Sequence, residues 1–306
     1  MDIKRVGIVG CGLMGSGIAQ TIAAAGFEVT VLEVEQRFLD KGFANMKKSL
    51  DKLAEKGKLK DSVETICGRL KGTTSPEDLA DCDLIIESIV ENVAEKQKVL
   101  AALDGIVNKD AIFASNTSSI SITELMTATK RHERFIGFHF SNPAPLLQLV
   151  EVVRTITTAP DVYESAVEFA KAIGKVPVRT SDKPAFILNR LLIPYMLDAI
   201  RAYEEGVGCI PDIDATMKLG AGHPMGPFTL LDLVGLDTMY NISIVMFDEF
   251  KERRFASPPL LKRMVMAGWL GRKTGRGFYD YSTPEKPEPM DAALQGIGTM
   301  AKAAAP

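Results

Sequence analysis

The chain has 306 residues, of which 46% are hydrophobic and 25% are charged, and its formal net charge is −3. The hydrophobic fraction excludes a disordered or low-complexity chain. The near balance of charges argues against a nucleic-acid partner, which usually requires a basic excess. The length predicts two domains, because a domain commonly holds roughly 100–200 residues.

Strand-like and helix-like segments alternate over the first part of the chain. Apolar, β-branched runs predict strands at 5–9, 28–32, 84–89, 111–114, 135–140 and 147–153, with a weaker candidate at 176–179. Helical patterns lie between them at 14–25, 36–56, 93–107, 122–127 and 162–173. Near-continuous apolar strands are typical of parallel strands buried on both faces. The alternation predicts an α/β fold with a Rossmann-type, doubly wound sheet.

The pattern changes near residues 181–184, after which helical periodicity dominates. We therefore expect a sheet domain over 1–183 and a mainly helical C-terminal domain over 184–282. The segment 283–306 is rich in proline, small residues and charges, which predicts a disordered or loosely attached tail.

No run of about 18 uncharged apolar residues is present, so we expect no membrane-spanning helix. The N-terminus enters the first predicted strand without the pattern of a leader peptide. The four cysteines have neither C-x-x-C nor zinc-ligand spacing, which predicts a reducing compartment and no metal site. These features favour a cytoplasmic protein.

A glycine-rich turn joins the first predicted strand to the first predicted helix, with G-x-G-x-x-G at Gly10, Gly12 and Gly15. Gly10 permits a tight turn, Gly12 lets the backbone approach a pyrophosphate, and Gly15 lets the helix pack closely on the strand. The helix N-terminus then offers free N–H groups to phosphates. The expected cofactor-binding residues of this turn are Gly10, Gly12, Leu13, Met14 and Gly15.

Glu33 ends the next predicted strand, where a carboxylate can accept hydrogen bonds from ribose hydroxyls. It would repel a 2′-phosphate, so NAD is favoured over NADP. Arg37, four residues later, keeps NADP as an alternative, and a turn without any ligand is another. Cys11 inside the loop is interpreted as a small spacer, because no basic partner that would make it redox-active is visible.

A dinucleotide site implies hydride transfer, and the oxidation of an alcohol also needs a proton acceptor. His132 and His223 lie in loops, whereas His139 ends an apolar strand, and such strand ends line the crevice of a doubly wound sheet. Glu151 lies in an apolar run where an unpaired charge would be very costly. A return strand would let Glu151 fix the imidazole tautomer and stabilise the imidazolium. A buried core histidine and a structural ion pair remain the alternatives.

Two polar clusters follow apolar segments: residues 115–119 after a strand, and Asn189 at the start of the first long helix of the second domain. Both fit ordinary helix caps or turns. Both also fit hydrogen-bonding groups at an interdomain cleft, which is a common place for ligands.

Taken in order, these motifs resemble the 3-hydroxyacyl-CoA dehydrogenase family, closest to its short, single-function bacterial members. The resemblance covers about residues 3–282. It rests on the segments 10–20, 89–92, 115–119, 139–143, 149–152, 186–190, 222–227 and 271–279. It implies reversible, NAD-dependent oxidation of an L-3-hydroxyacyl-CoA, with a short chain such as 3-hydroxybutyryl-CoA expected. It also implies that the helical domain over 184–282 binds substrate and forms a homodimer.

The resemblance also implies roles for single positions. His139 matches the catalytic base and Glu151 the carboxylate that orients it, while Ser118 and Asn189 match residues that position the substrate oxygen. The positions that match NAD contacts are Glu33, Glu91, Lys96, Ser118, Asn142 and Lys273. Ser49 and Lys56 match coenzyme A contacts, and they lie in a lysine-rich stretch, 47–60, that suits phosphates but is also typical of a solvated helix face.

The sequence departs from the family pattern at Glu33 (commonly Asp), Ser141 (frequently aromatic), Ala185 (usually Gly) and His223 (often aromatic). Two rival functions are weighed against the dehydrogenase. One is a β-hydroxyacid dehydrogenase that acts on a free acid with a lysine base, although no G-x-x-x-K-x-x-N helix is found. The other is a non-catalytic NAD-binding protein, like a lens crystallin.

Overall fold

The computed structural model describes residues 3–283 and 285–295 of the chain. The chain forms two compact units, Met1–Ile187 and Leu188–Pro306. The boundary therefore falls a few residues after the predicted one at 183/184.

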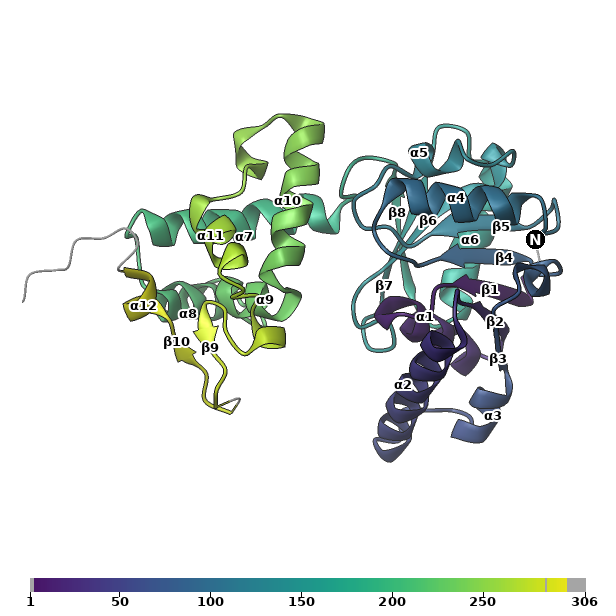
Figure 1. Ribbon diagram of the computed structural model, residues 1–306, viewed down its shortest axis with the longest axis horizontal. Helices are drawn as coiled ribbons and strands as arrows, with labels where there is room; N and C mark the ends of the chain where they lie inside the picture. Colours follow the sequence, from purple (N-terminus) through teal and green to yellow (C-terminus); the bar gives the residue numbers. More distant parts are fainter. Residues whose placement is uncertain (1–2, 284, 296–306) are drawn as a thin grey trace, which may run out of the picture. The chain divides into compact units, whose positions relative to one another are not determined.

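An eight-stranded sheet forms the centre of the first unit, in the order β3-β2-β1-β4-β5-β6-β7-β8 (Figure 1). Every neighbouring pair is parallel except β6 and β7, which are antiparallel. The strands are β1 (Arg5–Val9), β2 (Glu28–Leu32), β3 (Leu70–Thr73), β4 (Leu84–Glu87), β5 (Ile112–Ser115), β6 (Phe135–Phe140), β7 (Leu149–Arg154) and β8 (Val176–Ser181).

The sheet confirms the predicted doubly wound α/β fold, and one of its strands was not predicted. That strand, β3, lies at the edge of the sheet and carries Lys71 and Gly72, both exposed. An edge strand needs no continuous apolar run, so the pattern that indicates buried strands does not detect it. The strand order reverses between β1 and β4, and such a reversal opens a crevice at the carboxyl ends of the strands.

Helices cover both faces of the sheet (Figure 1). They are α1 (Leu13–Ala24), α2 (Gln36–Glu55), α3 (Val63–Gly68), α4 (Val93–Asp104), α5 (Ile122–Met126) and α6 (Pro160–Ala172), with the short helices η1 (Pro76–Leu79) and η2 (His132–Arg134). The adjacent strand residues Ile85 and Ile86 belong to different buried clusters, because successive side chains of a strand point to opposite faces. One cluster packs against α1, α2 and α6, and the other against α4 and α5.

The second unit is mainly helical, as predicted. Its elements are α7 (Leu188–Glu204), α8 (Ile210–Gly220), α9 (Pro227–Val234), α10 (Leu236–Phe250), η3 (Arg253–Phe255), α11 (Pro259–Met266), η4 (Arg272–Thr274), β9 (Tyr279–Asp280), β10 (Glu288–Pro289) and α12 (Asp291–Gln295). Among the described residues, no single helix has the length and apolar content to cross a membrane; α9 and α10 meet that test only when taken together, and they are bent by 94°.

The expectation of a loosely attached tail does not hold for residues 285–295. The strand β10 pairs with β9, and the Asp291 carboxylate accepts a hydrogen bond of 3.1 Å from Ile210 N at the start of α8. Leu294 is buried. A strand pair, a capped helix and a buried leucine thus hold this segment, and residues 296–306 lie outside the described ones.

Two buried carboxylates organise the second unit. Asp214 on α8 accepts hydrogen bonds from Phe228 N (2.7 Å) and Tyr279 OH (2.9 Å). Asp232 on α9 accepts from the backbone N–H groups of Phe278 and Tyr279, each at 2.9 Å. Burial raises the pKa of Asp232 to about 6, although these donors oppose the shift.

We expect Asp232→Ala to lower the free energy of unfolding of the second unit by about 3 kcal/mol, because buried N–H donors lose a charged acceptor. Urea unfolding followed by far-ultraviolet circular dichroism measures the change. Asp248→Ala is the matched control: Asp248 is exposed on α10 and pairs with Lys251, and its loss should change stability by less than about 0.5 kcal/mol. Equal stability of the two variants would contradict this role of Asp232.

Candidate active site

The turn after β1 has the geometry that a dinucleotide needs. Gly10 has a φ of +98°, which favours glycine, and a Cβ on Gly15 would lie 2.0 Å from the Gly10 carbonyl oxygen. A Cβ on Gly12 would meet nothing within 4 Å, and no side chain caps the start of α1. The first N–H groups of α1 therefore face an open space at Gly12, where a pyrophosphate fits.

Glu33 lies beside this turn. Its carboxylate accepts hydrogen bonds from Cys11 N (3.5 Å) and Val34 N (2.9 Å). Arg37 pairs with Glu35 at 2.8 Å. Arg37 therefore does not neutralise the Glu33 carboxylate, which faces the turn. A ribose with free hydroxyls fits this acidic position better than a 2′-phosphate does.

Cys11 packs as a spacer. A Cβ added to Gly42 of α2 would lie 2.1 Å from the Cys11 Sγ. The cysteine side chain therefore occupies the space that a side chain at position 42 would need. Burial, followed by the charge of Glu33, raises the pKa of the Cys11 thiol to about 11. A thiol of such high pKa is a poor nucleophile at neutral pH, which agrees with the interpretation from the sequence.

His139 and Glu151 form a buried pair. They lie directly opposite one another in the antiparallel register of β6 and β7, and His139 Nδ1 is 2.8 Å from Glu151 Oε2. The side chains are 9% and 1% exposed, respectively. One imidazole nitrogen is thus held by a carboxylate, and Nε2 is left as the nitrogen that can exchange a proton with a substrate.

The last residues of the first unit enclose this pair. The other oxygen of Glu151 accepts a 2.8 Å hydrogen bond from Ile187 N, and the Phe186 ring lies 5.5 Å from the imidazole ring. Ala185 and Phe186 have positive φ values of 63° and 50°. This conformation explains why glycine suits the Ala185 position, since it is costly for other residues.

Asn116 connects three strand ends at the site. Its Oδ1 accepts a 2.9 Å hydrogen bond from Phe140 N, directly after His139, and its Nδ2 lies 3.3 Å from Ser88 Oγ, directly after β4. Its own N–H donates to the carbonyl of Glu87 at 2.8 Å. The ends of β4, β5 and β6 are therefore held together beside the His139–Glu151 pair.

Ser118 and Glu91 meet in the crevice. Glu91 Oε1 accepts hydrogen bonds from Ser118 N (3.0 Å), Thr117 Oγ1 (2.5 Å) and Ser119 Oγ (3.1 Å). Glu91 Oε2 lies 3.3 Å from the buried Lys96 ammonium. Burial would raise the pKa of Glu91, but Lys96 and the donors outweigh it and hold the pKa below its usual value, so Glu91 is ionised at neutral pH.

The other predicted positions are distributed over both units. Asn142 is exposed and is the second residue after β6. Ser49 lies on α2 and Lys56 at the end of this helix. Asn189 is the second residue of α7, and Lys273 in η4 pairs with Asp237 at 2.5 Å. Because Asn189 and Lys273 belong to the second unit, their assignment to the site stays a prediction.

The two remaining histidines have local partners. His132 Nε2 lies 2.8 Å from the carbonyl oxygen of Thr129, and His223 Nδ1 lies 3.2 Å from Tyr195 OH. Both contacts are local, and the assignment of the base to His139 stays a prediction. Among the described residues, no group of three or more His, Cys, Asp or Glu side chains is placed to hold a metal ion.

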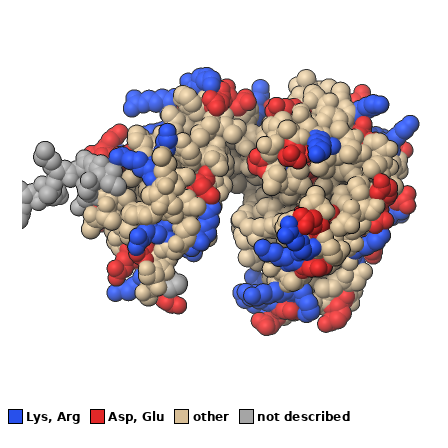
Figure 2. All heavy atoms as spheres, in the orientation of Figure 1, with Lys and Arg blue, Asp and Glu red and all other residues tan. Residues whose placement is uncertain are grey.

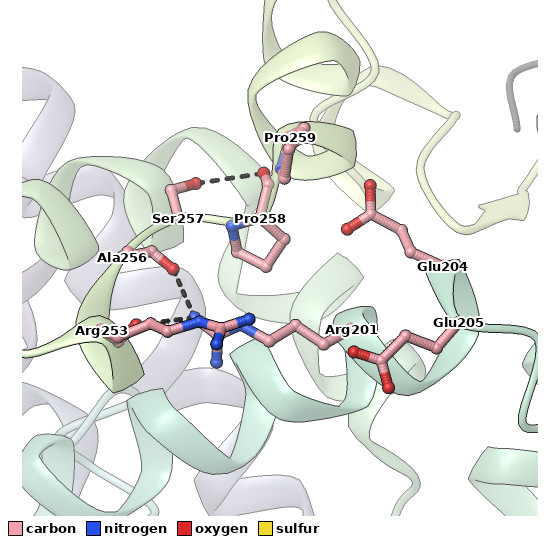
Figure 3. A pocket seen from close by; sticks show the side chains of 8 residues that line it. All are labelled: Arg201, Glu204, Glu205, Arg253, Ala256, Ser257, Pro258 and Pro259. Atoms are coloured by element: carbon pink, nitrogen blue, oxygen red, sulfur yellow. Dashed lines mark hydrogen bonds between the residues drawn. The ribbon is translucent and has the colours of Figure 1, made fainter.

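The second unit contains a charged hollow that none of the predicted site residues lines (Figure 3). Arg201 of α7 crosses it and donates to the carbonyl of Ala256, and Glu204 accepts a 3.0 Å hydrogen bond from Leu260 N. These side chains hold the segment after α10 against α7, which is a structural function.

Glu87 was not among the residues predicted from the sequence. This carboxylate lies in the apolar run 84–89 that was interpreted only as a strand, and it is completely buried. A charge in such a run indicates a buried, paired group, and the same signal did identify Glu151.

The open space at Gly12 generates a prediction. We expect Gly12→Ala to fold normally, because Gly12 has an extended conformation that alanine adopts, yet to raise the Kd for NADH by about tenfold or more, since the methyl group would separate the phosphates from the loop. Fluorescence titration measures the Kd. Gly68→Ala, also in open space but on α3, is the control. An unchanged Kd in Gly12→Ala would show that the phosphates lie elsewhere.

The comparisons with known proteins cover both units. Residues 5–183 match the NAD binding domain of 3-hydroxyacyl-CoA dehydrogenase, and residues 186–281 match the C-terminal domain of the same family. A probable 3-hydroxybutyryl-CoA dehydrogenase of Deinococcus radiodurans is 48% identical over 277 residues, which are 90% of this chain and 100% of the relative. The mitochondrial hydroxyacyl-coenzyme A dehydrogenase of Homo sapiens is 44% identical over 287 residues, 91% of each chain.

Solved structures show the same similarity to these dehydrogenases. The crystal structure of FadB2 from M. tuberculosis has a TM-score of 0.90 and 47% identity, covering 92% of this chain and 100% of that chain. The structure of (S)-3-hydroxybutyryl-CoA dehydrogenase from Ralstonia eutropha has a TM-score of 0.88 and 43% identity, with the same coverage. The chain belongs to the 3-hydroxyacyl-CoA dehydrogenase family.

Proposed function

We propose that this protein catalyses the reversible, NAD-dependent oxidation of an L-3-hydroxyacyl-CoA to a 3-oxoacyl-CoA, with a short acyl chain such as 3-hydroxybutyryl-CoA. The observation that carries the proposal is the buried His139–Glu151 pair near the carboxyl end of β6. The dinucleotide-binding turn leaves β1 at the same edge of the sheet, because β1, β4, β5 and β6 are parallel. The names of the related dehydrogenases support the short acyl chain.

In this reaction His139 is the base. Glu151 holds Nδ1, so Nε2 takes the proton from the hydroxyl group on C3, and Glu151 stabilises the imidazolium that results. NAD, when bound, accepts the hydride that leaves C3. In the reverse direction the imidazolium returns its proton to the ketone oxygen. Phe186 restricts the access of water to the imidazole, which strengthens its interaction with Glu151.

The remaining residues of the site would position the two ligands. Glu33 accepts hydrogen bonds from the adenosine ribose, and Glu91, an ionised acceptor at the crevice, takes hydroxyl groups nearer the reacting end. Lys96 lies beneath Glu91 with only 1% of its side chain exposed. Ser118 and Asn189 are proposed to hold the substrate oxygen. The further NAD contacts proposed from the resemblance are Asn142 and Lys273.

The coenzyme A end of the substrate is assigned to α2. Ser49 and Lys56 are seven residues apart and so share one face of the helix. Figure 2 shows basic side chains gathered near the end of this helix, with acidic ones among them. Lys47 pairs with Asp51 at 3.2 Å, whereas Lys56 is exposed at the end of α2, where a phosphate can reach it.

A test of the proposed base compares His139→Gln with His132→Gln. We expect His139→Gln to reduce kcat with acetoacetyl-CoA and NADH by about 10²- to 10⁴-fold, because the proton donor and acceptor is lost, while the Kd for NADH stays near that of the wild type. His132→Gln should retain full activity. An active His139→Gln enzyme would refute the assignment, and Glu151→Gln should likewise lose kcat more than NADH affinity.

The same assay separates the rival functions. A wild-type enzyme that oxidises only free hydroxy acids would favour the free-acid dehydrogenase, and a protein that binds NADH without any turnover would favour the non-catalytic role. A kcat/KM series over acyl lengths then tests the short-chain preference.

We also propose a homodimer formed by the helical unit, and a cytoplasmic location that rests on composition. Ile244 and Phe247 are three residues apart on α10 and are 40% and 37% exposed. The pair supports the assignment because aromatic residues are enriched at the cores of protein interfaces.

Sedimentation velocity should give the wild type twice the chain mass of 33.3 kDa. Phe247→Asp should shift it toward the monomer, because a charge enters an apolar contact. Ile156→Asp, an exposed position in the first unit, is the control and should leave the dimer intact. A monomeric wild type would contradict the dimer, and a dimeric Phe247→Asp would exclude this face of α10 from the interface.

A further inference from the structure

Glu87, the last residue of β4, is a buried carboxylate to which the proposed reaction gives no function. Its side chain is 0% exposed. Oε1 accepts hydrogen bonds from Lys96 Nζ (2.6 Å) and Ile89 N (2.7 Å), and Oε2 accepts one from Ser115 Oγ (2.6 Å). Both oxygens of this carboxylate are thus engaged by groups from three different segments of the chain.

Each of these three segments leads to a residue of the proposed site. Lys96 lies in the first turn of α4, and its Nζ is 2.6 Å from Glu87 Oε1 and 3.3 Å from Glu91 Oε2. This buried ammonium group therefore holds the Glu91 carboxylate from its buried side. Ile89 begins the turn that carries Glu91. Ser115 ends β5 and begins the loop whose Ser118 N donates to Glu91 at 3.0 Å.

Neutralising Lys96 does not by itself explain Glu87. A buried ion pair is often replaced by apolar residues of similar size without loss of stability, so the core does not require this pair. The additional hydrogen bonds from Ile89 N and Ser115 Oγ fix the direction of the carboxylate and connect the ends of β4 and β5. Residues behind a site that act in this way control its geometry rather than its chemistry.

We propose that Glu87 is a positioning residue for the NAD and substrate contacts of this enzyme. Its carboxylate fixes Lys96 and Ser115, and thereby holds the Glu91 carboxylate and the Ser118 hydroxyl group in the places where they meet the ligands. This inference rests on the function proposed above for Glu91 and Ser118.

The test is Glu87→Gln, which keeps the size of the side chain but removes its charge and turns one acceptor into a donor that faces Lys96 or Ser115. We expect the Kd for NADH to rise by about tenfold, as is common when an outer partner of a ligand-binding group is lost. We also expect kcat with acetoacetyl-CoA to fall. Fluorescence titration with NADH and the spectrophotometric assay supply the two readouts.

Two further variants separate positioning from stability. Asp104→Asn breaks the buried contact between Arg131 Nε and Asp104 Oδ1 (2.6 Å) at the other end of α4, so it should lower the unfolding midpoint but keep the Kd and kcat. The double variant Glu87→Gln/Lys96→Met removes both charges and should regain stability without regaining NADH affinity.

Three results would overturn the proposal: a Glu87→Gln enzyme with wild-type Kd and kcat, an equal loss of both in Asp104→Asn, or full recovery of both in the double variant. A wild type that does not reduce acetoacetyl-CoA would refute the proposed function instead. The NADH titrations would still decide the role of Glu87, because they need no turnover.

Discussion

A carboxylate taken out of water must be paired or hydrogen-bonded. Among the described residues, four carboxylates are almost completely buried: Glu87, Glu151, Asp214 and Asp232. Each gathers donors from segments that are distant in sequence. Asp214 and Asp232 hold the 278–281 segment against α8 and α9. In the first unit, Glu87 connects the ends of β4 and β5 through Ser115, and Glu151 connects β7 to Ile187. Removing any one of these carboxylates would leave several buried donors without an acceptor. The four groups therefore determine how the loops of both units are arranged.

The antiparallel strand β7 places the Glu151 carboxylate beside the His139 imidazole. A parallel neighbour of β6 would need a long crossover, whereas the return strand starts only a short loop after His139. The register places Glu151 directly opposite His139, and a slip by one residue would place Val150 or Val152 there instead. The flanking residues Phe138 and Phe140 are buried on the opposite face, so the apolar core itself fixes the register.

Much of this architecture is predictable from the sequence, for reasons that differ between residues. Strands buried on both faces must be apolar, so their order along the chain can be read directly, and the charge of Glu151 in such a strand already indicates a partner. The edge strand β3 has no such requirement and was missed. The network around Asn116 was also missed, because it depends on three strand ends that meet only in the folded sheet.

The end of the first unit is tied to the same pair. Ile187 N donates to Glu151, and the two residues before it adopt left-handed backbone conformations that cost about 1 kcal/mol or more each for residues other than glycine. Ala185 and Phe186 are nevertheless buried, and the Phe186 ring packs near the imidazole. The strained conformation lies where the chain leaves the sheet unit. It places Ile187 N within hydrogen-bond distance of the second oxygen of Glu151. Glu151 therefore has both oxygens fixed, one by the imidazole and one by the backbone, so the imidazole keeps the orientation that the proposed proton transfer requires.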